Sequence, residues 1–170
     1  MFKKQPKIDV QPTATDHKII RLGWILVISN FILVIAFYFK LPETIPTHFN
    51  LKGEADGFGS KSTLWVLPII SALTYLLMST IITKMKPWNF NYPTKVTKKN
   101  APKLYAMCLQ MMVWLNFGIA IMFLMITLEI LLKAIQFEVF RLGWAFIPLI
   151  SAIVLFPFWY IFKMFKVPKE

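Results

Sequence analysis

One stretch of the chain concentrates the side chains that could do chemistry. Residues 41–61 hold an imidazole, His48, together with three carboxylates, Glu43, Glu54 and Asp56. Such groups bind metals and transfer protons, but one histidine and three carboxylates on a loop are a poor ligand set for zinc. We therefore predict no metal site here, and we assign no cofactor.

The same stretch lacks a catalytic set. A histidine that acts as a general base needs a nucleophile within reach, and no serine or cysteine stands at a diagnostic spacing from His48. Residues 56–62 partly match a phosphate-binding loop, but Ser60 replaces the glycine required before Lys61. No catalytic residue is assigned, and we do not expect an enzyme. We expect His48 to hydrogen-bond the turn and fix the shape of the loop.

The loop is expected to be ordered. Pro42 and Pro46 favour extended backbone, and three glycines permit tight turns. Three apolar side chains are available for burial, and Ser60 or Ser62 could cap the helix that follows. The glycines are Gly53, Gly57 and Gly59, and the apolar residues are Ile45, Phe49 and Phe58.

Four long uncharged blocks flank this loop and follow it. They cover residues 22–39, 62–83, 104–128 and 142–162, which is 18, 22, 25 and 21 residues. At about 1.5 Å of rise per residue, each block is long enough to cross a hydrocarbon core of roughly 30 Å. We predict an all-α integral membrane protein, a bundle of four transmembrane helices at about 19–39, 62–83, 104–132 and 142–162.

The connections between these helices define the expected organisation. A basic tail, 1–18, precedes a domain over 19–85 that contains the loop 40–61. A basic loop, 84–103, leads to a helical hairpin over 104–162 with a short loop inside it, and a tail covers 163–170.

Charge is distributed unevenly over these connections. The residues before the first block (1–21), the loop 84–103 and the tail 163–170 carry 14 of the 19 basic residues and three of the eight acids, whereas the other two loops carry five of each sign. By the positive-inside rule, both termini are cytoplasmic and the loop 40–61 lies outside. We expect the bilayer as partner, with anionic lipids at the basic inner loop, and no nucleic acid.

Polar residues near the middle of the blocks are expected to face the bundle interior. Asn30 and Asn116 are predicted to pair, since polar groups in hydrocarbon are best satisfied by one another. Glu129 and Lys133 are spaced for an ion pair at the interface, four residues apart on a helix. The full set of midplane polar residues is Asn30, Ser71, Thr74, Asn116 and Ser151.

The loop also carries a pattern of residues at fixed spacing. It contains Pro42-x-x-Ile45-Pro46-Thr47-His48-Phe49, then Gly53-x-x-Asp56-Gly57 and Ser60-Lys61, with Pro68 in the next block. This pattern resembles the signature of a bacterial membrane domain of unknown function, which also forms the N-terminal half of the SdpI-like immunity proteins of the sporulation-delaying toxin system. The resemblance covers about residues 20–85. The second-half signature of those relatives is not recognised after Leu104.

The resemblance implies a multi-pass protein of the bacterial plasma membrane. In the relative, it implies protection against a secreted peptide toxin and relay of its presence to a cytoplasmic repressor. We therefore expect a protein of envelope recognition, immunity or signal relay that acts through residues 40–61 on a peptide, a lipid headgroup or a membrane-protein partner. The alternative is a small transporter or a transporter's membrane subunit, suggested by the midplane polar residues and by Pro148 and Pro157 in the last block.

Overall fold

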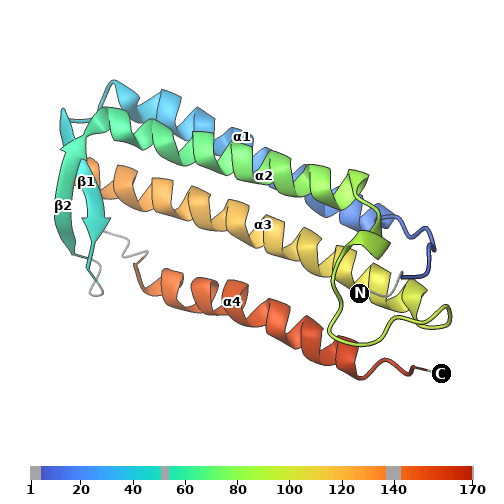
Figure 1. Ribbon diagram of the computed structural model, residues 1–170. Coiled ribbons are helices and arrows are strands. Elements are labelled where there is room, and N and C mark those ends of the chain that lie inside the picture. The colour runs from blue at the N-terminus through green and yellow to red at the C-terminus, as the bar shows by residue number, and fades with distance from the viewer. Residues whose placement is uncertain (1–4, 51–53, 137–142, 170) are drawn as a thin grey trace.

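A computed structural model of the chain describes residues 5–50, 54–136 and 143–169. Four helices in this part of the chain are long and apolar enough to cross a membrane, so the predicted four-helix membrane bundle is confirmed. Two short strands and two short 3-10 helices accompany them (Figure 1). In chain order the elements are α1 (Ala14–Tyr38), β1 (Thr44–Phe49), β2 (Ala55–Ser60), η1 (Lys61–Trp65), α2 (Val66–Lys84), η2 (Pro87–Asn89), α3 (Ala101–Ala134) and α4 (Gly143–Phe165).

Local signals explain where α1 begins. It begins at Ala14, before the uncharged block, because Thr13 and Asp16 form a capping box. The Thr13 hydroxyl accepts from the Asp16 N–H at 3.2 Å, and the Asp16 carboxylate accepts from the Thr13 N–H at 2.8 Å. The polar residues at the start of α1 therefore form a capped helix N-terminus.

The other helices follow the uncharged blocks closely. The Ser60 side chain caps η1 by accepting from the Ser62 N–H, and η1 leads directly into α2. Pro102 lies in the first turn of α3, where its missing N–H costs nothing. Helix α4 is continuous through Pro148 and Pro157.

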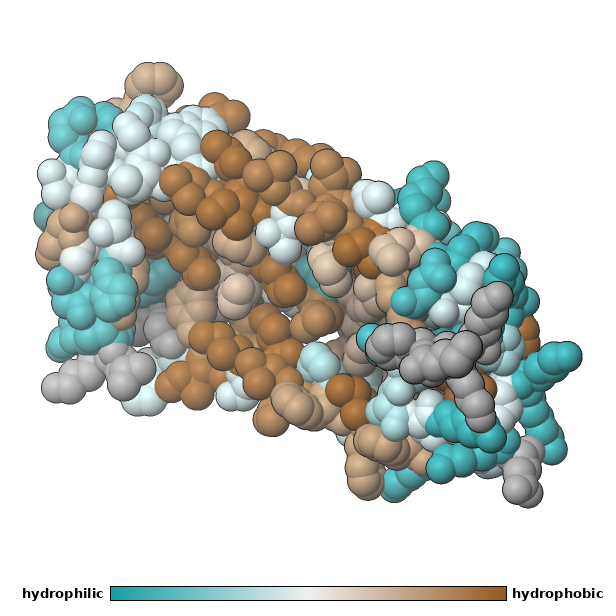
Figure 2. Space-filling view, viewed as in Figure 1, coloured by the Kyte–Doolittle hydropathy of each residue, from teal (hydrophilic) through white to brown (hydrophobic). Residues whose placement is uncertain are grey.

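Helices α1, α2 and α3 pack together, and α4 lies along α3 (Figure 1). In the most apolar window of each helix, 28 to 33% of the residues of the first three are buried, against 6% for α4. Brown apolar side chains cover the middle of the molecule, and teal polar ones gather at its two ends (Figure 2). This banding is the surface that a bilayer requires.

We call the end with the strands the hairpin end and the end with both chain termini the terminal end. The terminal end is folded. Gln5 donates to the Phe90 carbonyl at 2.7 Å, and the Tyr105 hydroxyl donates to the Pro6 carbonyl at 2.8 Å. The Asn100 amide donates to the Pro168 carbonyl at 3.2 Å. The N-terminal tail, the loop 84–103 and the C-terminal tail are therefore joined by hydrogen bonds, and we call these three segments together the cap.

The cap has its own apolar core and a basic surface. Its buried residues are Ala101, Leu104, Tyr105, Cys108, Met164 and Val167. Asp9 accepts from Lys86 at 3.1 Å, and hydrogen bonds from Gln11 and Lys86 lower the pKa of its carboxyl. The exposed basic residues of the three segments are Lys7, Lys18, Arg21, Lys84, Lys86, Lys95, Lys98, Lys99, Lys103, Lys163, Lys166 and Lys169.

Candidate functional site

The predicted loop is largely a β-hairpin, which sequence analysis did not foresee. Strands β1 and β2 pair antiparallel, with irregular register around His48. Gly57 lies opposite His48, and a Cβ on Gly57 would come 2.9 Å from the Cβ of His48. Glycine is needed at position 57 for this close approach within a strand, rather than for the tight turn expected from its residue type.

The three carboxylates of the hairpin are held in three different places. Asp56 pairs with His48, with Oδ1 2.5 Å from Nδ1. Glu43 accepts from Lys61 at 2.8 Å, and Glu54 accepts from Asn50 at 2.9 Å. Among the described residues, no three histidine, cysteine or carboxylate side chains are grouped so as to hold a metal ion.

The base of the hairpin is anchored in the bundle. Ile45 is fully buried and belongs to a core cluster with Leu41 and Leu64. Helices α1 and α3 complete this cluster with Val34 and Ile130. The base of the hairpin is therefore packed into the apolar core of the bundle.

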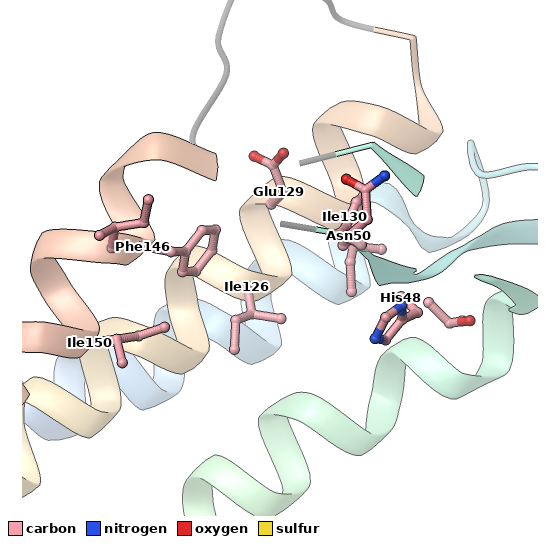
Figure 3. A pocket seen from close by; sticks show the side chains of 10 residues that line it. His48, Asn50, Ile126, Glu129, Ile130, Phe146 and Ile150 are labelled. Atoms are coloured by element: carbon pink, nitrogen blue, oxygen red, sulfur yellow. The ribbon is translucent and has the colours of Figure 1, made fainter. Parts of the chain in front are cut away.

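A cavity of about 370 Å³ lies between this hairpin and helices α3 and α4. Figure 3 looks into it, with His48 from β1, Asn50 directly after β1, Ile126, Glu129 and Ile130 from α3, and Phe146 and Ile150 from α4. Thr47, Phe49 and Ile147 complete the lining. Six of the ten lining residues are apolar, so the cavity suits an apolar group flanked by polar ones.

Glu129 is the one carboxylate in this lining. Only 4% of the residue is exposed, so its side chain lies inside the fold. Its expected ion pair with Lys133, which is half-buried, stays a prediction. A buried carboxyl group beside apolar side chains adds polar atoms to one side of the cavity.

Some residues of the sequence pattern lie in the buried base of the hairpin, and others lie at the cavity. Ile45 and Pro46 are buried, and Lys61 is mostly covered. His48 and Phe49 line the cavity, with Asp56 and Gly57 behind His48. Pro42 and Phe58 are exposed, although Phe58 was expected to be buriable. Gly53 lies outside the described residues.

The walls supplied by α3 and α4 were missed by sequence analysis. In the sequence these walls look like any other part of an apolar span. Only the packing shows that Ile126, Phe146 and Ile150 line one cavity with residues of β1. Glu129 was the available signal, because it follows directly on a run of 25 uncharged residues. Its spacing from Lys133 favours an ion pair at the membrane interface and does not by itself point to a cavity.

The predicted pair of Asn30 and Asn116 does not form. Val27, Tyr75 and Ala120 share one core cluster, and from that level Asn30 lies three residues toward the hairpin end and Asn116 four residues toward the terminal end. Seven residues of helical rise separate the two amides by about 10 Å. Sequence position within each block could not reveal this offset.

The midplane residues instead have separate environments. Asn116 donates to the Ser79 hydroxyl at 3.2 Å and to the Tyr75 carbonyl at 3.5 Å. The amide nitrogen and oxygen of Asn30 and the hydroxyl of Ser71 are buried and hydrogen-bond to no described residue. Thr74 is half-buried.

Ser151 is exposed, which corrects the expectation that it faces inward. Helix α4 packs on α3 through the face that contains Ile153, which lies close to Gly118. Two residues along a helix turn by about 200°, so Ser151 lies on the opposite face.

The part of the chain that contains the hairpin is similar to a known protein family. Residues 25–72 match the family described as Domain of unknown function (DUF1648), a range that runs from the middle of α1 through both strands into α2. A protein of Archaeoglobus fulgidus, described as uncharacterized, is 35% identical over 94 residues, which is 55% of this chain and 49% of that protein. The match thus spans about half the length of the relative. No solved structure matches the chain.

Proposed function

We propose that this chain is a multi-pass protein of the bacterial plasma membrane, with both termini cytoplasmic, that recognises an amphipathic peptide at its outer surface. The orientation is supported by charge, because the basic residues of the cap gather at the terminal end, while residues 40–61 carry three lysines and three carboxylates. The hairpin end then faces outward. No catalytic set supports an enzyme, and recognition is therefore proposed as a binding function.

The cavity at the hairpin end is the observation that carries this proposal. It joins a strand of the DUF1648 range to the two helices beyond that range, so both halves of the chain build one binding surface. Its apolar walls suit the apolar side chains of a peptide, and Thr47, His48, Asn50 and Glu129 offer polar contacts.

The strand itself favours an extended peptide. The sheet has two strands, so β1 is paired with β2 along one edge only, and the last three residues of β1, 47–49, line the cavity together with Asn50. An extended peptide can add to such an edge through backbone hydrogen bonds while its side chains enter the adjacent pocket. The resemblance to SdpI-like immunity proteins points to a secreted peptide toxin as the ligand class and to the basic cap as the relay.

The proposal is tested by filling the cavity. Ile150→Trp adds bulk at a lining position of α4, and Leu155→Trp adds the same bulk at an exposed position of α4 away from the cavity. A sensitive bacterial host that produces the chain is challenged with the secreted sporulation-delaying peptide, and binding of that peptide to the protein in nanodiscs is measured by calorimetry. We expect protection and binding from the wild type and Leu155→Trp, and loss of both from Ile150→Trp.

Lack of both protection and binding by the wild-type chain would reject this peptide as the ligand. Equal behaviour of the two tryptophan variants would reject the cavity as the site.

A small transporter, or a membrane subunit of one, is the second candidate. The observation in its favour is the set of buried polar atoms on Asn30 and Ser71 between α1 and α2, which no described residue satisfies. A polar path across a bundle needs such groups. Flux of small ions or amphiphiles through proteoliposomes that is abolished by Asn30→Leu would support this candidate, and absence of flux would count against it.

A further inference from the structure

A second cavity lies at the terminal end, between the beginning of α1 and the first turns of α3. Its volume is about 170 Å³. It is separate from the hairpin-end cavity, and none of its residues was singled out from the sequence. Its lining residues are Gln11, Thr13, Asp16, Lys103, Ala106, Met107, Leu109 and Gln110.

Asp16 is the buried acid of this cavity, with 4% of the residue exposed. Its Oδ2 accepts from the N–H of Thr13 at 2.8 Å and from the Thr13 hydroxyl at 2.7 Å. Its Oδ1 is buried and hydrogen-bonds to no described residue. The capping box thus accounts for one oxygen of the carboxylate and leaves the other available to a ligand.

No ion pair between the described residues includes the Asp16 carboxyl group. Lys103 lines the same cavity, yet the ion pairs between described residues do not include one from Lys103 to Asp16. A buried carboxylate is strongly disfavoured unless a cation or several donors compensate it. A positively charged donor that enters the cavity would supply this compensation.

The rim of the cavity is exposed and carries a basic side chain, in contrast to the buried carboxyl group of Asp16. Lys103, Gln11 and Gln110 are exposed and open toward the surface of the bundle. The cavity is bounded by the first turns of α1 and α3, next to the buried Ile19 and Ile20 where the apolar part of α1 begins. A ligand that carries both charges would place its cationic group beside Asp16 inside the cavity and its anionic group beside Lys103 at the rim. The cavity then lies at the level where lipid headgroups meet the acyl chains.

We propose that this cavity binds the headgroup of an ethanolamine phospholipid, with its primary ammonium donating to Asp16 Oδ1 and its phosphate beside Lys103. A primary ammonium has three N–H donors, so it can hydrogen-bond a carboxylate. A choline headgroup has no N–H to donate, and a glycerol headgroup carries no positive charge. In the orientation proposed above, the bound lipid belongs to the cytoplasmic leaflet.

The experiment measures lipid selectivity of the full chain. Protein purified in detergent is given phosphatidylethanolamine, phosphatidylcholine and phosphatidylglycerol with identical acyl chains, and bound lipid is counted by native mass spectrometry. We expect the wild type to retain the ethanolamine lipid over the choline lipid by about tenfold or more, as a hydrogen bond between charged groups provides.

Asp16→Asn is the central variant because its amide oxygen can still accept from Thr13 and preserve the cap. We expect it to lose the preference between ethanolamine and choline lipids. Asp9→Asn is the matched control, since Asp9 is an exposed carboxylate at the same end of the bundle. It should keep the wild-type preference.

A second variant guards against misfolding of the first. Ala106→Phe fills the cavity from an exposed position without touching the capping box, and it should also abolish the preference while helical circular dichroism stays unchanged. Equal retention of the two lipids by the wild type, or an undiminished preference in Asp16→Asn and Ala106→Phe, would overturn the proposal. Displacement of the lipid by an equal concentration of free phosphoethanolamine would overturn the assignment to a membrane lipid.

Discussion

The Tyr75 hydroxyl donates to the Ile20 carbonyl at 3.0 Å, across the interface of α1 and α2. Gly23, one turn beyond Ile20, makes room for the Tyr75 ring, since a Cβ at Gly23 would lie 1.9 Å from the tyrosine oxygen. Trp24 packs edge to face on the same ring, with centroids 5.2 Å apart. A small residue thus allows a large aromatic one to reach a backbone carbonyl within the membrane.

We predict that Gly23→Ala destabilises the bundle by about 1 to 3 kcal/mol, because the tyrosine must move and its hydrogen bond breaks. The measurement is thermal unfolding of the purified protein in detergent. Gly118→Ala is the control, since its Cβ would meet only the flexible Ile153 side chain, at 3.2 Å. Equal losses in the two variants would contradict the special role of Gly23.

Gly57→Ala is predicted to disturb the hairpin more than His48→Ala does. The new Cβ would lie 2.9 Å from the Cβ of His48, so the strands must separate. Removal of the exposed His48–Asp56 pair should cost no more than about 1 kcal/mol, the usual range for exposed pairs. Hydrogen exchange of the β1 and β2 amides would report the difference, and faster exchange in His48→Ala than in Gly57→Ala would refute it.

The two midplane asparagines are predicted to respond oppositely to leucine. Asn116→Leu removes hydrogen bonds to Ser79 and to the Tyr75 carbonyl, and it should cost about 0.6 to 2 kcal/mol. Asn30→Leu removes polar atoms that no described residue satisfies, so it should be neutral or stabilising. Unfolding of both variants under one set of conditions decides the matter, and a larger loss from Asn30→Leu would show that Asn30 has a partner of its own.

Cysteine labelling tests the orientation. Phe58→Cys places a thiol on an exposed position of β2, and Lys98→Cys places one on the cap. The single native cysteine, Cys108, is buried and should react slowly. A membrane-impermeant maleimide should label position 58 in intact cells and position 98 only after permeabilisation. The reverse pattern would invert the orientation and place the hairpin-end cavity in the cytoplasm.

The long uncharged blocks made the bundle predictable, because only helices of that length satisfy their own backbone in hydrocarbon. The length of the blocks does not predict which residues of different helices lie side by side, as Asn30 and Asn116 show. Their depth depends on how far α3 is offset along α1, and that offset is set by packing such as that of Val27 on Ala120. Sequence position alone therefore suggested a pair that does not exist.

The hairpin and the two cavities were hidden for related reasons. Gly57 resembled a turn residue, since its reason for being glycine lies on the opposite strand, in His48. Some of the residues that line the hairpin-end cavity together with Glu129 belong to β1 and α4, and β1 is far from Glu129 in sequence. Asp16 is recognisable as a helix cap from the sequence, but the burial of its second oxygen becomes visible only when α3 lies beside it.

Helix α3 is one unbroken element of 34 residues, which corresponds to about 51 Å at the usual rise. Ile126 and Glu129 near one end line the hairpin-end cavity, while Leu104 and Tyr105 at the other end form the core of the cap. Its backbone hydrogen bonds are continuous, so the distance between its two ends is fixed by the helix itself. One continuous helix therefore joins residues of the hairpin-end cavity to the core of the cap, at opposite sides of the apolar band.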